Sequence, residues 1–346
     1  MYMTKKIAMI TGDGIGPELI KSTFDLLNEF IPTSVELILC EAGYNWWSNN
    51  QGDTLIPDET IQILDDSDFC LKGPTITPTV PNFPQSVAVT IRQKYQLYAN
   101  VRPIKSFVEN YKYKNIDFVC VREATEGMYS GIGFTVSDET AISIRKITKT
   151  SCDRVANFAF KLADKRNWNK VIAIHKANIL RETDDLFLRS VKLVSEKYNG
   201  IELEDYLVDN MAQQLLKNPN RFNHNILLST NLFMDILSEE ASGLIGSIGC
   251  VYSANFGDNY AMFEPAHGSA PKYANLDKVN PTATILSAAW LLEYIGEKRI
   301  SSAIFDGTRQ TIIDGNFVTY DLGGTSGTKE MSREIIKKTH EILSNN

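Results

Sequence analysis

The sequence of 346 residues contains no long hydrophobic run, no excess of positive charge and no paired cysteines. Without an apolar stretch of about 20 residues, a membrane-spanning helix is excluded. The formal net charge of −7 disfavours a general nucleic-acid or anionic-membrane surface, so an anionic substrate needs a local basic pocket. The five cysteines form no CxxC pair and several lie in apolar runs, which is typical of free thiols in a reducing compartment.

Targeting segments, internal repeats and long linkers are also missing. An apolar strand-like run begins at Lys5 or Lys6, which leaves no room for a signal or transit peptide, so we expect a cytoplasmic protein. A chain of this length is expected to form two domains or lobes. Because no stretch rich in proline, glycine and serine separates them, strands that cross between the lobes are the expected connection.

Short apolar runs alternate with helical patterns along most of the chain. The strand-like KIAMIT (6–11) precedes a helical pattern over 17–30, and VIAIHK (171–176) precedes another over 184–198. This alternation predicts an α/β fold in which helices cover the strands of a sheet. The run 135–148 alternates weakly and predicts an exposed hairpin or arm.

The glycine-rich stretch MITGDGIGPELI (9–20) raises the question of a bound dinucleotide. A dinucleotide fingerprint has the spacing G-x-G-x-x-G, but here the third glycine, Gly16, comes one residue early and Pro17 takes the last position. Proline at the first helical position is a good helix starter. Gly12, Gly14 and Gly16 therefore indicate a tight strand-to-helix turn rather than a phosphate site.

Three arginines stand out as candidates for gripping carboxylates, since the planar guanidinium makes bidentate hydrogen bonds. Arg92 and Arg102 lie in IRQKYQLYANVRPIKS, and Arg122 precedes Tyr129 in VCVREATEGMYSG. Any one of them alone is more simply an arginine in a surface salt bridge. Arg122, however, ends a buried-looking strand, where polar residues tend to face a cleft.

Two acids, Asp235 and Glu239, are four residues apart and share one face of a predicted helix. Such oxygen ligands suit Mg²⁺ or Mn²⁺, whereas the simpler alternative is a solvated helix face. Asp209 begins another predicted helix, where it is either a further acid of interest or an N-cap. Lys176 ends a strand and is either a base with a lowered pKa or a lysine that faces solvent.

Taken together, these stretches resemble the β-decarboxylating dehydrogenases: the isocitrate, 3-isopropylmalate, homoisocitrate and tartrate/malate enzymes. The matching segments are GDGIGPE, LYANVRP, VRE-x-TEG-x-Y, HKANIL, VDNMA, MDILSEEAS, EPAHGSAPKYA and KVNPTA. They follow the family order from residue 11 to about 327, so the resemblance covers nearly the whole chain.

The resemblance implies an isocitrate/isopropylmalate dehydrogenase-like fold of two α/β domains, which is not a Rossmann fold. Residues 1–99 and 253–346 would form a discontinuous large domain that binds the cofactor. Residues 100–252 would form a small domain with the dimer interface and the arm. The implied assembly is a homodimer with shared active sites, acting on a small tricarboxylate or dicarboxylate.

The same resemblance assigns a role to each candidate residue. Arg92, Arg102, Arg122 and Ser86 would bind the substrate, while Tyr129 and Lys176, the latter from the neighbouring subunit, would move protons. Asp235 and Glu239 would hold Mg²⁺ or Mn²⁺ together with Asp209 of the other subunit. Glu239 stands where most relatives have aspartate. The residues implied in cofactor binding are Thr77, Glu264, His267, Gly268, Ala270, Lys272, Tyr273, Asn280 and Tyr320.

The reaction that the resemblance favours is the conversion of isocitrate to 2-oxoglutarate and CO₂, with reduction of NADP. Ser86 lies six residues before Arg92, as in isocitrate enzymes, although Ala88 replaces the usual asparagine and TVPNFPQS (79–86) replaces a glycine-rich stretch. Lys272 and Tyr273 match NADP-dependent relatives, whereas Gly324 lies where some of them have arginine. The alternatives are 3-isopropylmalate or homoisocitrate with NAD, and a non-catalytic regulatory subunit.

Overall fold

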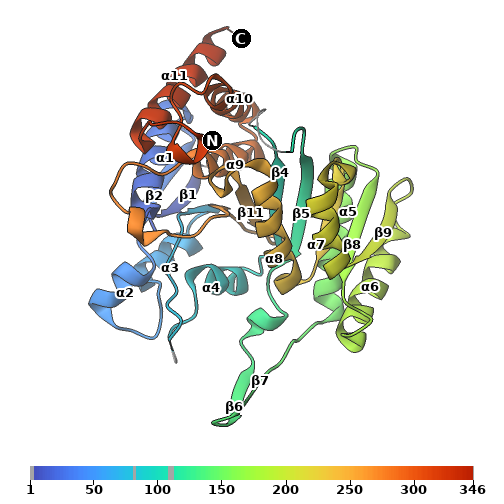
Figure 1. Cartoon of the computed structure of the whole chain (residues 1–346). Coiled ribbons are helices and arrows are strands. Elements are labelled where there is room, and N and C mark those ends of the chain that lie inside the picture. Colours follow the sequence, from blue (N-terminus) through green and yellow to red (C-terminus); the bar gives the residue numbers. More distant parts are fainter. Residues whose placement is uncertain (1–3, 81–82, 108–112, 346) are drawn as a thin grey trace.

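Ten strands of the described chain form one continuous sheet through the centre of the molecule (Figure 1). The structure is a computed structural model that describes residues 4–80, 83–107 and 113–345. The strand order is β2-β1-β3-β12-β11-β4-β5-β10-β8-β9. The strand bounds are β1 Lys5–Ile10, β2 Val35–Cys40, β3 Phe69–Lys72, β4 Ala99–Lys105, β5 Asp117–Glu123, β8 Lys170–His175, β9 Glu202–Leu207, β10 Ile226–Ser229, β11 Tyr252–Phe256 and β12 Ala261–Pro265.

The centre of this sheet is antiparallel and its two wings are parallel. β11 pairs antiparallel with β12 and β4, and β4 pairs antiparallel with β5. Both ends of the chain build one wing, because β3 pairs with β12, and the middle of the chain builds the other. The sheet itself thus connects the two halves, as expected, and the strand order differs from a Rossmann sheet. The domain limits given above stay a prediction.

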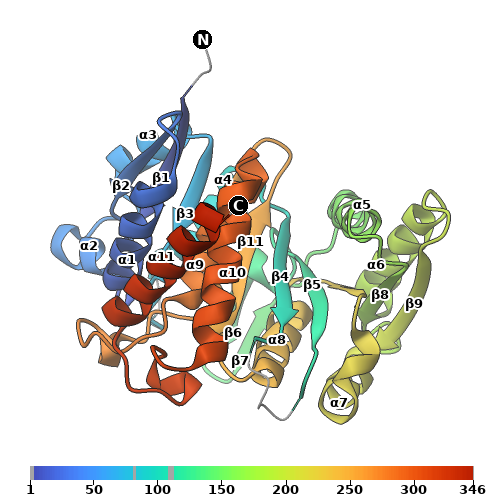
Figure 2. The same cartoon turned by 90° about the horizontal axis from the view of Figure 1, so that it is seen from above.

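Helices cover both wings. Figures 1 and 2 show α1, α9, α10 and α11 packed together over one half, and α5 and α6 beside the other. The helix bounds are α1 Gly16–Phe30, α2 Tyr44–Asn50, α3 Asp58–Asp65, α4 Val87–Lys94, α5 Lys149–Lys165, α6 Arg181–Ser195, α7 Val208–Lys217, α8 Asn231–Ser242, α9 Thr282–Ile295, α10 Lys298–Asp314 and α11 Thr328–Asn345.

The predicted arm is a separate two-stranded ribbon, β6 (Gly133–Ser137) and β7 (Thr140–Ser143). Figure 1 shows that it projects away from the rest of the molecule. The ribbon ends earlier than the predicted run 135–148. Both of its faces are exposed, so its apolar side chains find no partner within the described part of this chain.

The glycine-rich turn is structural, as predicted. Gly12 and Gly14 have φ angles of 72° and 59°, in the left-handed region that favours glycine. A Cβ on Gly12 would lie 2.2 Å from the Pro74 carbonyl oxygen, and one on Gly14 would lie 2.1 Å from that of Ser269. The intervening N–H groups bind protein as well, since Ile15 N–H donates to the Ser269 carbonyl (2.9 Å). The turn therefore anchors the 264–283 loop instead of a phosphate.

All five cysteines are buried and free, which agrees with the predicted role of small apolar residues. Within the described ranges, no helix is both long and apolar enough to cross a membrane.

Candidate active site

The structure brings the three predicted arginines together on one face of the sheet, where each is buried. Arg92 lies in α4, and Arg102 and Arg122 lie in the neighbouring strands β4 and β5. Arg92 Nε and Asn100 Nδ2 both donate to Asn255 Oδ1, at 2.8 and 2.9 Å. Arg102 Nε donates in turn to Asn100 Oδ1 at 3.1 Å. A continuous hydrogen-bond chain thus links Arg92 to Arg102.

Asp235, in α8, joins the other two arginines. Its Oδ1 accepts from Arg102 Nη2 at 3.2 Å and from Arg122 Nη1, and its Oδ2 accepts from the Tyr129 hydroxyl. Burial raises the pKa of Asp235, but Arg122 and Arg102 outweigh it and hold that pKa below its usual value. We call Arg102, Arg122, Tyr129 and Asp235 the Asp235 cluster.

Tyr129 contacts this cluster through its ring and its hydroxyl. The Arg122 guanidinium carbon lies 4.8 Å from the ring centre, a cation–π distance. Burial and the hydrogen bond to Asp235 raise the pKa of Tyr129, so its hydroxyl stays protonated at neutral pH.

Arg122 also carries a buried nitrogen, Nη2, with no hydrogen-bond partner among the described residues. Burial, and then the charge of Arg92, lower the pKa of Arg122 to about 10. A buried donor without a partner costs roughly 1–3 kcal/mol. A substrate carboxylate placed here would supply the missing acceptor and offset the crowding of positive charge.

Glu239 lies one helical turn after Asp235, and its Oε1 accepts from Arg102 Nη1 at 2.8 Å. The two acids share one helix face as predicted, and this face meets the arginines, although half of the Glu239 side chain is exposed to solvent. Hard oxygen donors of this kind fit Mg²⁺ or Mn²⁺. Within the described residues, no group of three or more histidine, cysteine, aspartate or glutamate side chains is placed to hold a metal ion.

Lys176 and Asp209 form their own ion pair, with Lys176 Nζ 2.7 Å from Asp209 Oδ2. No hydrogen bond or ion pair joins either residue to the Asp235 cluster in the described structure. The N-cap alternative for Asp209 is wrong, because Leu207 is the N-cap of α7 and Asp209 lies within its first turn. The hydrogen bond from Lys176 lowers the pKa of Asp209.

The backbone at Lys176 is fixed by Asp184, which sequence reasoning missed. Asp184 is fully buried, and its Oδ2 accepts the Lys176 N–H at 2.6 Å while its Oδ1 accepts from Arg145 at 2.5 Å. In the sequence, Asp184 is only an acidic residue in the first turn of a helix, which is not enough to identify it as a site residue.

A second missed residue is Lys72, at the end of β3. Lys72 Nζ lies 2.9 Å from Glu264 Oε2, and Arg92 Nη2 lies 2.8 Å from Glu264 Oε1. Burial raises the pKa of Glu264, but these two cations dominate and lower it far below its usual value. The sequence feature that could have revealed Lys72 is its position in LKGP, at the carboxyl end of a buried strand. Glu264 therefore belongs to the arginine network.

A cavity of about 250 Å³ lies beside the glycine-rich turn, against the loop that follows β12. Six of the predicted cofactor residues line it: His267, Gly268, Ala270, Tyr273, Asn280 and Tyr320. Asp321 is a lining residue that the sequence did not reveal. Its Oδ2 accepts from Asn280 Nδ2 at 3.0 Å and from Ser247 Oγ at 2.5 Å. We call this space the loop cavity.

Besides Glu264, two predicted cofactor residues lie outside the lining of the loop cavity. Thr77 is exposed in the loop after β3. Lys272 is exposed on the 3₁₀ turn Pro271–Tyr273, with its Nζ 5.0 Å from the Tyr273 ring centre, and that ring lies 5.9 Å from the Tyr320 ring. Gly324 leaves no room for arginine, since a Cβ there would lie 2.1 Å from the Val318 carbonyl oxygen.

Ser86 is the N-cap of α4, and its Oγ accepts the Val89 N–H at 3.3 Å. The capping role suggested by the local sequence is therefore confirmed. Of the preceding loop TVPNFPQS, Pro81 and Asn82 lie outside the described residues.

Comparisons with known proteins agree on one family. Residues 6–335 match the family described as isocitrate/isopropylmalate dehydrogenase. The chain is 43% identical to a homoisocitrate dehydrogenase of Methanocaldococcus jannaschii (98% of this chain, 99% of the relative) and 39% identical to a 3-isopropylmalate dehydrogenase of Methanothermobacter thermautotrophicus (96% and 98%). A crystal structure of isocitrate dehydrogenase from Methylococcus capsulatus matches with a TM-score of 0.91 at 38% identity, covering 97% of this chain and 99% of that one.

Proposed function

Because the chain belongs to the isocitrate/isopropylmalate dehydrogenase family, we propose that it oxidatively decarboxylates isocitrate to 2-oxoglutarate, with NADP as the oxidant. The observation that carries the proposal is the Asp235 cluster, in which Arg122 Nη2 is a buried donor without a partner. Malate derivatives present two adjacent carboxylates, which is the chemistry that paired arginine forks recognise.

In this proposal Arg92, Arg102 and Arg122 hold the substrate carboxylates, and their burial strengthens each contact. Asp235 and Glu239 hold a divalent ion, and the cavity-lining loop holds the nicotinamide dinucleotide. When bound, the ion polarises the substrate hydroxyl and the nicotinamide accepts hydride. Lys176 takes the hydroxyl proton. Tyr129, kept protonated by its raised pKa, returns a proton to carbon after CO₂ leaves.

We propose that Lys176 and Asp209 act on a second copy of the chain. Their ion pair makes no bond to the Asp235 cluster of their own chain, and Asp209 is largely exposed. The arm supplies a surface for pairing, because its apolar side chains project into solvent, and monomeric proteins rarely expose such patches. These exposed residues are Ile132, Phe134, Val136, Ile142 and Ile144.

Ser86 supports isocitrate as the substrate. Its oxygen accepts a backbone N–H, which leaves the hydroxyl hydrogen free to donate to a third carboxylate. The N-terminus of α4 adds a favourable dipole for an anion. Homoisocitrate, one methylene longer, is the second candidate, because a relative 43% identical to the chain bears the name homoisocitrate dehydrogenase.

The deciding experiment compares kcat/KM for isocitrate, homoisocitrate and 3-isopropylmalate, each with NADP and with NAD in the presence of Mn²⁺. We expect the highest value for isocitrate with NADP. A higher value for either other acid would replace the proposed substrate. No turnover with any of the three would favour a non-catalytic regulatory subunit.

A further inference from the structure

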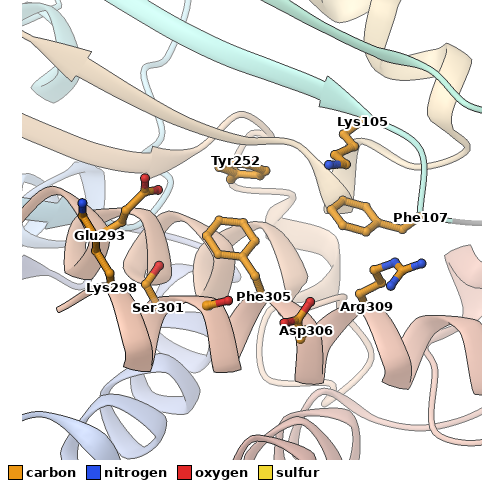
Figure 3. A pocket seen from close by; sticks show the side chains of 10 residues that line it. Lys105, Phe107, Tyr252, Glu293, Lys298, Ser301, Phe305, Asp306 and Arg309 are labelled. Atoms are coloured by element: carbon orange, nitrogen blue, oxygen red, sulfur yellow. The ribbon is translucent and has the colours of Figure 1, made fainter. Parts of the chain in front are cut away.

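A second cavity, of about 420 Å³, lies between the strands β4 and β11 and helix α10 (Figure 3). Side chains of a strand alternate between faces. In β4, Arg102 belongs to the Asp235 cluster on one face of the strand, whereas Lys105 lines the cavity on the other. In β11, Asn255 accepts a hydrogen bond from Arg92 on the site face, whereas Tyr252 lines the cavity. Helix α10 closes the other side. We call this space the reverse-face cavity.

Two hydroxyl groups of the lining, those of Tyr252 and Ser301, are accessible from the cavity. The two residues are 8% and 2% exposed, and neither side chain makes a hydrogen bond within the described structure. Burial raises the pKa of Tyr252 above its usual value, so its hydroxyl remains a donor. A polar group of a ligand in the cavity would supply the partner that each hydroxyl lacks in the protein.

Charged side chains of both signs surround these hydroxyls without pairing with one another. Lys298 and Arg309 are basic, Glu293 and Asp306 are acidic, and no ion pair joins any of the four in the described residues. Lys105 adds a further cation, and its Nζ lies 3.6 Å from Asp117 Oδ2. Opposite charges left apart around one space suit a ligand that carries both a carboxylate and an ammonium group.

Aromatic side chains occupy the middle of the lining. Figure 3 shows Tyr252 and Phe305 between Glu293 and Lys298 on one side and Arg309 on the other. The Tyr252 and Phe305 rings are 5.5 Å apart. Cavities of roughly 300–1,000 Å³ hold small molecules. We propose that the reverse-face cavity binds a free α-amino acid with an aromatic or apolar side chain, a ligand unrelated to the proposed reaction.

The test is direct binding of L-phenylalanine to the purified full chain, measured by calorimetry and by tryptophan fluorescence, to which Trp290 contributes from a ring 5.6 Å from that of Tyr252. We expect one saturable site. 3-Phenylpropionate lacks the ammonium group and phenethylamine lacks the carboxylate, so each should bind at least about tenfold more weakly.

Tyr252→Phe and Ser301→Ala remove only hydroxyls that have no partner in the protein, so both variants should fold normally. Each should weaken phenylalanine binding about three- to tenfold. Tyr294→Phe, one residue beyond Glu293 and outside the lining, is the matched control and should bind as the unmodified chain does. The proposal is overturned by absence of saturable binding up to roughly 10 mM, by equal affinity for a singly charged analogue, or by variants with unchanged affinity. None of these measurements depends on dehydrogenase activity.

Discussion

At the scale of single residues, the proposed preference for NADP rests on Tyr273, which lines the loop cavity, and on Lys272 next to it. A lysine and a tyrosine hydroxyl can bind the 2′-phosphate of NADP, whereas an aspartate there would repel it and accept bonds from the ribose hydroxyls of NAD. Lys272→Asp with Tyr273→Ile should lower the ratio of kcat/KM for NADP over NAD about 100-fold.

Lys278→Asp, which changes the same charge elsewhere on that loop, should leave the cofactor ratio nearly unchanged. If the unmodified protein turns over faster with low NAD than with equal NADP, the role given to these two residues is wrong.

Glu264 is one carboxylate through which acid should destabilise the fold. Its pKa is depressed in the folded state, so its stabilising effect is complete above its unfolded pKa of about 4.3 and is lost as pH falls toward the folded value. Glu264→Gln would leave Lys72 and Arg92 buried without their counter-charge, which costs about 3–5 kcal/mol near pH 7.

Urea unfolding at a series of pH values measures this effect. The stability gap between the unmodified chain and Glu264→Gln should stay constant above about pH 5.5 and narrow steadily below about pH 4.5. Glu330→Gln, at an exposed position, provides the control and should show no such gap. A gap that did not depend on pH would mean that Glu264 is not held ionised by its two neighbours.

At the scale of elements, regular apolar patterns predicted most helices and the parallel strands. These patterns did not predict strand β11, in the antiparallel centre of the sheet. β11 reads YSANF, and its polar Ser253 and Asn255 are buried because Asn255 bonds Arg92 across the site. β11 does alternate apolar and polar residues, but over only five positions, and alternation alone would assign the polar face to solvent rather than to a buried site.

The residues of the candidate site also fall into those that the sequence could reveal and those that it could not. Residues within recognisable motifs, such as Asp235 and Arg122, could be named from the sequence. Lys72, Asp184 and Asp321 could not, since their importance arises from partners distant in sequence: Glu264, Arg145 and Asn280.

The arm is the element that most directly tests the proposed assembly. Phe134→Ser, Val136→Ser and Ile142→Ser together remove three of its five exposed apolar side chains without disturbing any buried contact. If this surface is covered by a second copy, sedimentation should show a shift from dimer to monomer, with activity lost in parallel. Thr135→Ser with Thr140→Ser is the matched control. An unmodified chain that sediments as an active monomer would contradict the shared site.

At the scale of the whole molecule, a shared site predicts complementation. Tyr129→Phe and Lys176→Ala should each abolish most activity, and mixing the two variants under conditions of subunit exchange should restore some. In a mixed dimer, one of the two sites regains both residues, so recovery should reach about a quarter of normal activity if exchange is random. No recovery despite demonstrated exchange would place Lys176 in the same chain's own site or outside any site.

The five buried cysteines should make the folded chain unreactive toward thiol reagents. Burial raises the pKa of Cys40, Cys120, Cys152 and Cys250 to about 12, and raises that of Cys70 well above its ordinary value. Alkylating reagents attack thiolates, so at pH 8 the native protein should consume almost none of the reagent. Because these thiols are spread over both wings of the sheet, the order in which they become labelled during gradual denaturation would reveal which wing opens first.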